Sequence, residues 1–132
     1  MRQVVAAIIT RAPDNKILIC QRRKDQPLGL KWEFPGGKVE PAEEPRAALR
    51  RELQEELGIE AEIGEELTRF QHRYKNGGGV ELTFFRILRY TGEMQNIIFK
   101  DIRWVDRRSL PQFDFLEADV KLVRRIADGD IL

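Results

Sequence analysis

The sequence has little cysteine and histidine and no long apolar run. Its 132 residues include one cysteine, Cys20, and one histidine, His72. One thiol cannot form a disulfide within the chain, and its place in the apolar stretch 17–20 favours a buried, inert side chain. The apolar stretch 4–9 lacks the length of a membrane span, and strand-forming residues follow where a signal cleavage site would be needed. We therefore expect a cytoplasmic protein with no membrane partner.

An excess of either charge is also absent. Lys and Arg number 23 against 22 for Asp and Glu, which gives a net charge of +1 at pH 7. A near-neutral chain gives no reason to expect a nucleic-acid polymer as partner. If the protein handles phosphates, it must do so with local groups. The length fits about one domain with a single hydrophobic core.

The chain contains a mixture of strand and helix patterns. Short β-branched or alternating segments predict strands or extended chain at residues 4–10, 16–22, 32–34, 67–74, 80–90 and 102–105. The turn at residues 13–16 should join the first two strands as a hairpin, and the glycine-rich residues 75–79 should join another. We expect a mixed α/β domain, whose strand order the sequence leaves open.

Two helices are expected, each with one apolar face. The first spans residues 45–57, because Pro45 suits a first helical position and Gly58 suits a carboxyl-terminal cap. Its apolar stripe consists of Leu49, Leu53 and Leu57. The second spans about residues 116–127, where apolar residues recur at a spacing of three to four. These residues are Leu116, Val120, Val123 and Ile126.

Three glutamates share a different face of the first helix. Glu52, Glu55 and Glu56 lie within an arc of roughly 100°, and like charges so spaced destabilise a helix. The helix dipole also disfavours carboxylates near the carboxyl-terminal end. The turn at Gly36-Gly37 precedes the helix and could offer a carbonyl as a further ligand. Because Mg²⁺ prefers oxygen ligands, this arrangement suits a metal site, and a solvated acidic helix face is the alternative.

The spacing of these residues resembles a known family motif. From Gly37 the chain runs through five residues to Glu43, through seven to Arg51-Glu52-Leu53, and on to Glu55-Glu56 and Gly58-Ile59. This pattern resembles the Nudix box, with every fixed position filled. The resemblance implies an α/β fold of the Nudix α/β/α sandwich type, with a mixed β-sheet and a single domain over residues 1–132.

The resemblance also implies a metal-dependent hydrolase. Its catalytic metal ligands would be Glu52, Glu55, Glu56 and the carbonyl of Gly36. Arg51, which lies four residues before Glu55, would orient the glutamates by a salt bridge, and Glu43 would support the site from the loop. The implied cofactor is Mg²⁺, with Mn²⁺ as the alternative. Metal ions would neutralise the charge that develops as water attacks a phosphorus of a diphosphate chain.

Residues 32–40 and 50–59 are similar to the MutT-like branch of the family. That branch is known for converting 8-oxo-dGTP to its monophosphate and pyrophosphate, so an oxidised purine nucleotide is the leading substrate. A pyrimidine triphosphate (CTP, dCTP or a methylated form) is the alternative substrate. A Nudix module that binds a nucleotide without cutting it is the alternative of another class. The expected partner is a small-molecule nucleotide, and both a monomer and a homodimer remain open.

By the same likeness, five residues outside the metal-binding set would contact the nucleotide. Phe34 would contact the base, Lys38 would lie near the phosphates, and Arg22 would bind phosphate. His72 lies in a region that faces the substrate cleft in relatives. Asp119 stands where the branch has a base-reading asparagine, and a carboxylate suits a base edge that offers hydrogen-bond donors.

Most of these residues also have a purely structural interpretation. Phe34 could pack in the core, Arg22 could be a solvated strand end, and His72 could be an ordinary strand residue. Asp119 or Glu117 could cap the second helix.

One acidic residue of the family pattern is missing. Relatives often carry a glutamate six residues before the tryptophan of the late strand, and here that position is Ile98. Asp101 or Glu93 would substitute for it if the loop shifts. Otherwise catalysis would rest on the box helix alone.

Overall fold

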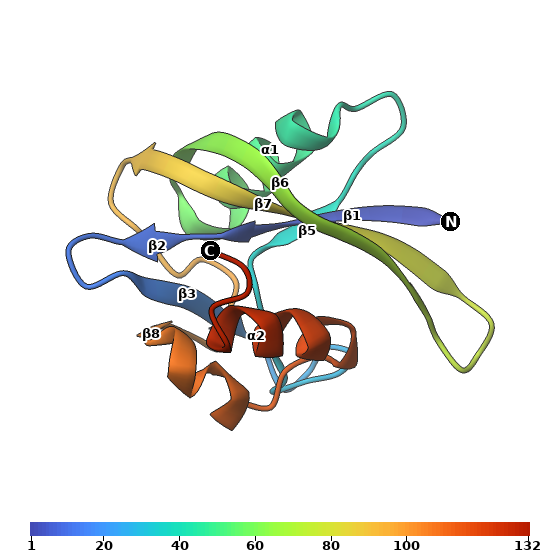
Figure 1. Ribbon diagram of the computed structural model, residues 1–132. Helices are drawn as coiled ribbons and strands as arrows, with labels where there is room; N and C mark the ends of the chain where they lie inside the picture. The colour runs from blue at the N-terminus through green and yellow to red at the C-terminus, as the bar shows by residue number, and fades with distance from the viewer. The chain divides into compact units, whose positions relative to one another are not determined.

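A four-stranded mixed sheet is the framework of the first of two units in the chain (Figure 1). The computed structural model describes residues 1–132, and this unit contains Met1–Ile8 and Pro35–Ile97. The strand order is β5 (Gly36–Lys38), β1 (Arg2–Ile8), β7 (Gly79–Thr91) and β6 (Glu60–Arg73). Strands β1 and β7 are parallel, and the other neighbours are antiparallel.

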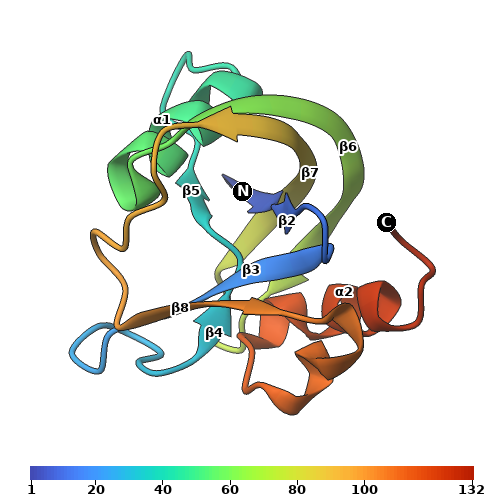
Figure 2. The same cartoon turned by 90° about the vertical axis from the view of Figure 1, so that its left-hand side faces the viewer.

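Helix α1 (Pro45–Leu57) packs against β1, β5 and β6 and has the bounds that the sequence predicts (Figure 2). It begins after Glu44, whose side chain accepts a hydrogen bond of 3.1 Å from the Ala47 backbone N–H. It ends at Gly58 in the left-handed region, with φ of 68°. Its predicted leucine stripe is fully buried (Leu49, Leu53 and Leu57). No helix in the structure is long and apolar enough to cross a membrane.

Strands β6 and β7 form the predicted glycine-turn hairpin, with His72 opposite Val80. The first of these strands begins at Glu60, seven residues before the predicted start at Leu67. Its early part contains register irregularities around Gly64, and four of its first seven residues are glutamates. A long polar strand of this kind lacks the apolar alternation by which strands are recognised.

The second unit contains Ile9–Phe34 and Ile98–Leu132 and has its own antiparallel sheet. Strand β3 (Lys16–Gln21) pairs with β2 (Thr10–Arg11), β4 (Trp32–Glu33) and β8 (Asp101–Val105). The predicted single strand over residues 4–10 is therefore wrong. The chain leaves β1 at Ile8 and re-enters a different sheet at Thr10, so the hairpin partner of β3 is β2 alone.

The predicted second helix is shorter than expected. Two 3₁₀ turns, η1 (Arg107–Gln112) and η2 (Glu117–Asp119), precede α2 (Val120–Ala127). The Trp32 N–H donates to the Asp114 carbonyl at 2.9 Å, and the Leu116 N–H donates to the Trp32 carbonyl at 3.0 Å. These bonds hold the chain before the helix extended. Val120, predicted on the apolar face, is 47% exposed, while Leu122, Val123 and Ile126 are buried.

The buried stripe of α1 predicts a specific stability effect. Leu53→Ala should lower the free energy of unfolding by about 2–5 kcal/mol, because a fully buried leucine leaves a cavity when it is truncated. Leu88→Ala is the matched control, since Leu88 is 58% exposed and should change stability by less than about 0.5 kcal/mol. Urea unfolding of both variants measures the effect, and equal midpoints would contradict it.

Candidate functional site

Two glutamates of α1 lie against the backbone of Gly36 and Gly37. Glu56 is only 6% exposed, and its Oε1 accepts a hydrogen bond of 3.3 Å from the Gly36 N–H. A Cβ added to Gly37 would lie 2.5 Å from Oε2 of Glu52, closer than real contacts allow. The glycine at this position therefore makes room for a carboxylate, and two carboxylates gather at one short stretch of strand β5.

Arg51 holds the carboxylates around the start and middle of α1. Its Nε and Nη2 donate to Glu43 at 2.9 Å each, and Nη1 donates to Glu52 at 2.9 Å and to Glu55 at 3.4 Å. Nη2 also donates to the Lys38 carbonyl at 3.1 Å. The hydrogen bonds from Arg51 lower the pKa of Glu43 to about 2. The predicted ion pair between Arg51 and Glu55 is therefore present and is one of several that this guanidinium makes.

The donor set suits a hard divalent cation, because it consists of carboxylate and carbonyl oxygens. In the present arrangement no three carboxylate, imidazole or thiol groups converge closely enough to hold a metal ion. Arg51 engages Glu52 and Glu55, and Glu56 is bonded to Gly36. A cation at this position would compete with Arg51 for the same oxygens, so metal ligation by these residues stays a prediction.

Two predicted substrate contacts lie elsewhere in the first unit. Lys38 ends β5 with its side chain exposed, and its carbonyl is bound by Arg51. His72 is half-buried on β6, with its ring edge-on to Tyr74 at 4.9 Å between centroids. Contact of either residue with a substrate remains a prediction.

The second unit contains a pair of carboxyl groups. Asp119 is 4% exposed, and burial raises its pKa to about 8, with a further contribution from the negative charge of Glu33. Burial also raises the pKa of Glu33, against the opposing charge and hydrogen bonds of Arg22. We call Glu33 and Asp119 the carboxyl pair. Because burial and the charge of Glu33 both disfavour ionisation of Asp119, the pair favours retaining a proton at neutral pH.

Glu33 is not among the residues that the sequence predicts for the site. Its signal is the extended segment in which Trp32 and Phe34 are buried, which turns the side chain between them to the opposite face. The partner, Asp119, lies far along the chain, so no local pattern connects the two. A carboxylate that faces away from two buried aromatics was the available clue.

The other residues predicted in this unit are engaged by protein groups. The Arg22 side chain donates to Glu33 and to the Pro27 carbonyl. Phe34 is 4% exposed and packs against Phe115 at 5.4 Å between ring centroids. Asp119 stands at the amino-terminal end of α2, but its side chain makes no capping hydrogen bond, so the capping alternative is wrong for Asp119.

The structure does not supply an acid at Ile98, which is 40% exposed. Asp101 is bound by Arg103 at 2.8 Å, in strand β8. Glu93 is exposed on the loop after β7. Substitution by either acid remains a prediction.

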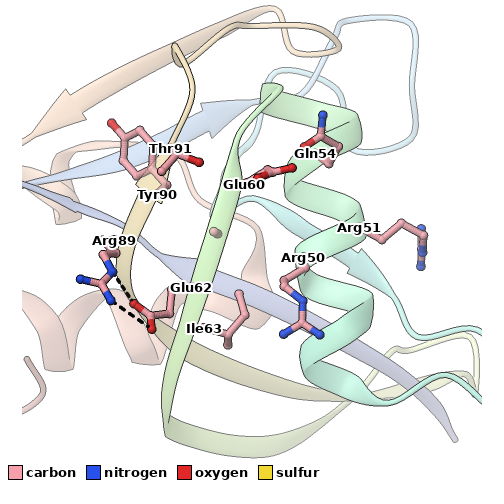
Figure 3. Close-up of a pocket in the computed structure, with 10 residues that line it drawn as sticks. Arg50, Arg51, Gln54, Glu60, Glu62, Ile63, Arg89, Tyr90 and Thr91 are labelled. Atoms are coloured by element: carbon pink, nitrogen blue, oxygen red, sulfur yellow. Dashed lines mark hydrogen bonds and ion pairs between the residues drawn. The ribbon is translucent and has the colours of Figure 1, made fainter.

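A pocket of about 660 Å³ opens on the first unit beside α1 (Figure 3). Arg50, Arg51 and Gln54 line it from the helix, and the Glu62–Arg89 ion pair lines it from β6 and β7. In Figure 3 the Arg51 side chain points away from that ion pair. Apart from Arg51, none of the predicted site residues lines this pocket, so it plays no part in the assignment of function.

Comparison with known proteins identifies the family. The family model of the NUDIX domain matches residues 1–126. The CTP pyrophosphohydrolase of Escherichia coli K12 is 41% identical over 123 residues, which are 93% of this chain and 89% of the relative. The 8-oxo-dGTP diphosphatase of Haemophilus influenzae is 36% identical over 122 residues, which are 92% of this chain and 89% of the relative.

A solved structure agrees with the same assignment. The solution structure of the E. coli ORF135 protein matches with a TM-score of 0.83 and 40% identity, over 94% of this chain and 86% of that one. This likeness confirms the predicted mixed α/β fold with a mixed sheet. Both the motif and the matches along the chain thus lead to one conclusion: the chain belongs to the Nudix hydrolase family.

Proposed function

We propose that the chain is a Mg²⁺-dependent nucleoside triphosphate pyrophosphohydrolase, with 8-oxo-dGTP or a related oxidised purine nucleotide as its substrate. The products are a nucleoside monophosphate and pyrophosphate. The observation that supports the reaction is the gathering of Glu52 and Glu56 at the Gly36-Gly37 backbone, in a family whose relatives include named diphosphatases. Mn²⁺ is the alternative metal.

The residues divide the work of diphosphate cleavage. Glu52, Glu55, Glu56 and the Gly36 carbonyl would hold the metal, which neutralises charge on the diphosphate and acidifies water. Arg51 would position the carboxylate of Glu52, because it forms ion pairs with both Glu43 and Glu52. Lys38, exposed at the end of β5, is proposed to attract the phosphates by its charge. His72 is proposed as a further contact of the nucleotide.

The carboxyl pair is the proposed reader of the base. With one proton on the pair, one group donates a hydrogen bond and the other accepts one. Guanine presents two acceptors, N7 and O6, on its major-groove edge. Oxidation at C8 places a hydrogen on N7, which turns that edge into a donor beside an acceptor. The pair therefore complements the oxidised purine edge better than the normal one, and Phe34 would contact the same base.

A second substrate is favoured by a specific observation. The relative with 41% identity carries the name CTP pyrophosphohydrolase. Cytosine offers an amino donor beside the N3 acceptor, which the same carboxyl pair can match. CTP, dCTP or a methylated form is therefore the alternative substrate.

We also propose that residues 1–132 form one Nudix domain, because the family model extends over residues 1–126. The near-neutral charge supports free nucleotides rather than nucleic-acid polymers as partners. A cytoplasmic location, as a monomer or a homodimer, completes the proposal.

Release of pyrophosphate from a panel of nucleotides tests the function. The panel contains 8-oxo-dGTP, dGTP, CTP, dCTP and 5-methyl-dCTP, each with Mg²⁺, Mn²⁺ or a chelator. We expect Mg²⁺-dependent turnover that is fastest with 8-oxo-dGTP. Glu56→Gln should lower kcat by roughly 100-fold or more, whereas the control Glu65→Gln, on an exposed carboxylate, should leave it unchanged.

Two results of this panel would change the assignment. If dCTP turned over 100-fold faster than 8-oxo-dGTP, the pyrimidine alternative would replace the leading substrate. If nucleotides bound without any metal-dependent turnover, the chain would be a binding module.

Gly37→Ala should separate catalysis from folding. The added Cβ meets the carboxylate of Glu52, which is the movable end of a side chain and can swing away. We expect unfolding free energy to change by less than about 1 kcal/mol, while metal-dependent hydrolysis falls by roughly 100-fold. Gly78→Ala is the control, because its nearest neighbour would be 3.5 Å away. Full activity in Gly37→Ala would show that the position of Glu52 does not matter.

Asp119→Asn should raise stability at alkaline pH. The folded-state pKa of Asp119 lies above the unfolded value, so the folded chain binds the proton more tightly and loses stability as pH rises towards about 8. The neutral isostere removes this loss, which amounts to about 1.4 kcal/mol for each pKa unit. Thermal unfolding should therefore show little difference from wild type near pH 4 and a gain of at least about 1 kcal/mol at pH 8.

Asp114→Asn is the control for that titration, because its carboxylate is 73% exposed and bound by Lys31. Its stability relative to wild type should not rise with pH. Parallel stability curves for wild type and Asp119→Asn would mean that Asp119 is ionised at neutral pH.

A further inference from the structure

Arg22 is held by two protein groups in the second unit. Its Nε donates to the Pro27 carbonyl at 2.9 Å, and its Nη1 lies 3.3 Å from each oxygen of Glu33. The side chains of Arg22 and Glu33 are 21% and 19% exposed. A guanidinium that is hydrogen-bonded to two protein groups keeps a defined orientation. Its positive charge lies beside Glu33, which is one member of the carboxyl pair.

Backbone hydrogen bonds between Trp32 and residues 114–116 hold the segments of Glu33 and Asp119 together. The two carboxyl groups have unequal surroundings. Burial raises the pKa of Glu33, and the charge and hydrogen bonds of Arg22 oppose that rise. The charged group that acts on Asp119 is Glu33, which opposes ionisation of Asp119, as does its burial. Of the other cations on these segments, Lys31 is paired with Asp114 and Arg103 with Asp101, and Lys121 and Arg124 of α2 are exposed.

We propose that Arg22 is a positioning residue that sets base specificity, by keeping Glu33 ionised so that the proton of the carboxyl pair stays on Asp119. Glu33 then presents a fixed acceptor and Asp119 a fixed donor. This inference rests on the proposed function, in which the pair reads the base. It assigns to Arg22 a role different from the phosphate contact that the family resemblance implies.

The two roles of Arg22 differ in what its removal does. Without a cation beside Glu33, the proton can reside on either carboxyl group, and the pair no longer presents one pattern. Bases that fit the pattern then lose their advantage over bases that do not. Loss of a phosphate contact would instead weaken every triphosphate alike, since each carries the same phosphate chain.

Kinetics on Arg22→Gln, Glu33→Gln and the double variant distinguish these roles. Arg22→Gln should lower kcat/KM for the preferred nucleotide by roughly 10- to 100-fold, the scale of a lost hydrogen bond to a charged group. It should lower kcat/KM less for the non-preferred nucleotides. In the Glu33→Gln background the same substitution should have little further effect, because Arg22 acts through Glu33.

The neighbouring Arg23→Gln is the matched control, since Arg23 is 57% exposed and paired with Asp25, and it should leave base preference unchanged. The proposal would be overturned in favour of a phosphate contact if Arg22→Gln lowered kcat/KM equally for every nucleotide and if the effects of the two substitutions multiplied in the double variant.

Carboxyl ¹³C NMR titration of the whole protein tests the proposal without any turnover. In wild type Glu33 should ionise at lower pH than Asp119. Arg22→Gln should move the ionisation of Glu33 to higher pH, whereas Arg22→Lys, which keeps a cation, should preserve the order. An unmoved Glu33 in Arg22→Gln, or Asp119 ionising first in wild type, would overturn it.

Amide NMR spectra establish that each variant is folded. If Arg22→Gln does not fold, Arg22→Lys is compared with wild type instead. If Glu33 no longer ionised before Asp119 in Arg22→Lys, the positive charge at residue 22 would not be what sets the order of ionisation, and the proposal would be overturned. Failure of wild type to cleave any nucleotide would contradict the proposed function, while the titration would still decide the role of Arg22.

Discussion

Hydrogen bonding of several clustered carboxylates to one guanidinium is the interaction on which the first unit depends. Arg51 bonds to Glu43 before α1, to Glu52 and Glu55 on it, and to the Lys38 carbonyl at the end of β5. Without a cation here, the carboxylates would repel one another along the helix and its preceding loop. The guanidinium therefore ties helix, loop and strand together. A metal ion that entered would compete for the same oxygens, so stability and metal affinity would then be linked at this point.

Local rules account for the parts of the fold that the sequence predicts well. Helix α1 is predicted with correct bounds because its signals are adjacent in the chain: Pro45 at the start, Gly58 in the left-handed region at the end, and a leucine stripe between them. The break between β1 and β2, and the late start of α2, are different. Backbone hydrogen bonds with Trp32 hold residues 114–116 extended, and pairing between distant segments overrides the helical spacing seen in the sequence.

The same distinction applies to the candidate site. The box glutamates and Gly37 lie in one continuous stretch, so spacing alone identifies them, and the space at Gly37 gives a physical reason for glycine there. Glu33 and Asp119 come from segments that only the fold brings together. No periodicity connects them, and Glu33 is therefore missed. Arg22 is noticed, but its tether to Glu33 and Pro27 could not be read from the chain.

Arginine has opposite effects in the two units. Arg51 gathers several carboxylates that a hard cation could share, which serves the diphosphate common to all nucleoside triphosphates. Arg22 contacts the half-buried Glu33 and, in the proposed arrangement, leaves the buried Asp119 to hold a proton, which would create an asymmetric pair of hydrogen-bonding groups. With the proposed residue roles, diphosphate chemistry would depend on a contiguous motif, whereas base preference would depend on a few distant side chains. Such a division would let base preference change without altering the box, and it fits relatives of similar identity that are named for CTP and for 8-oxo-dGTP.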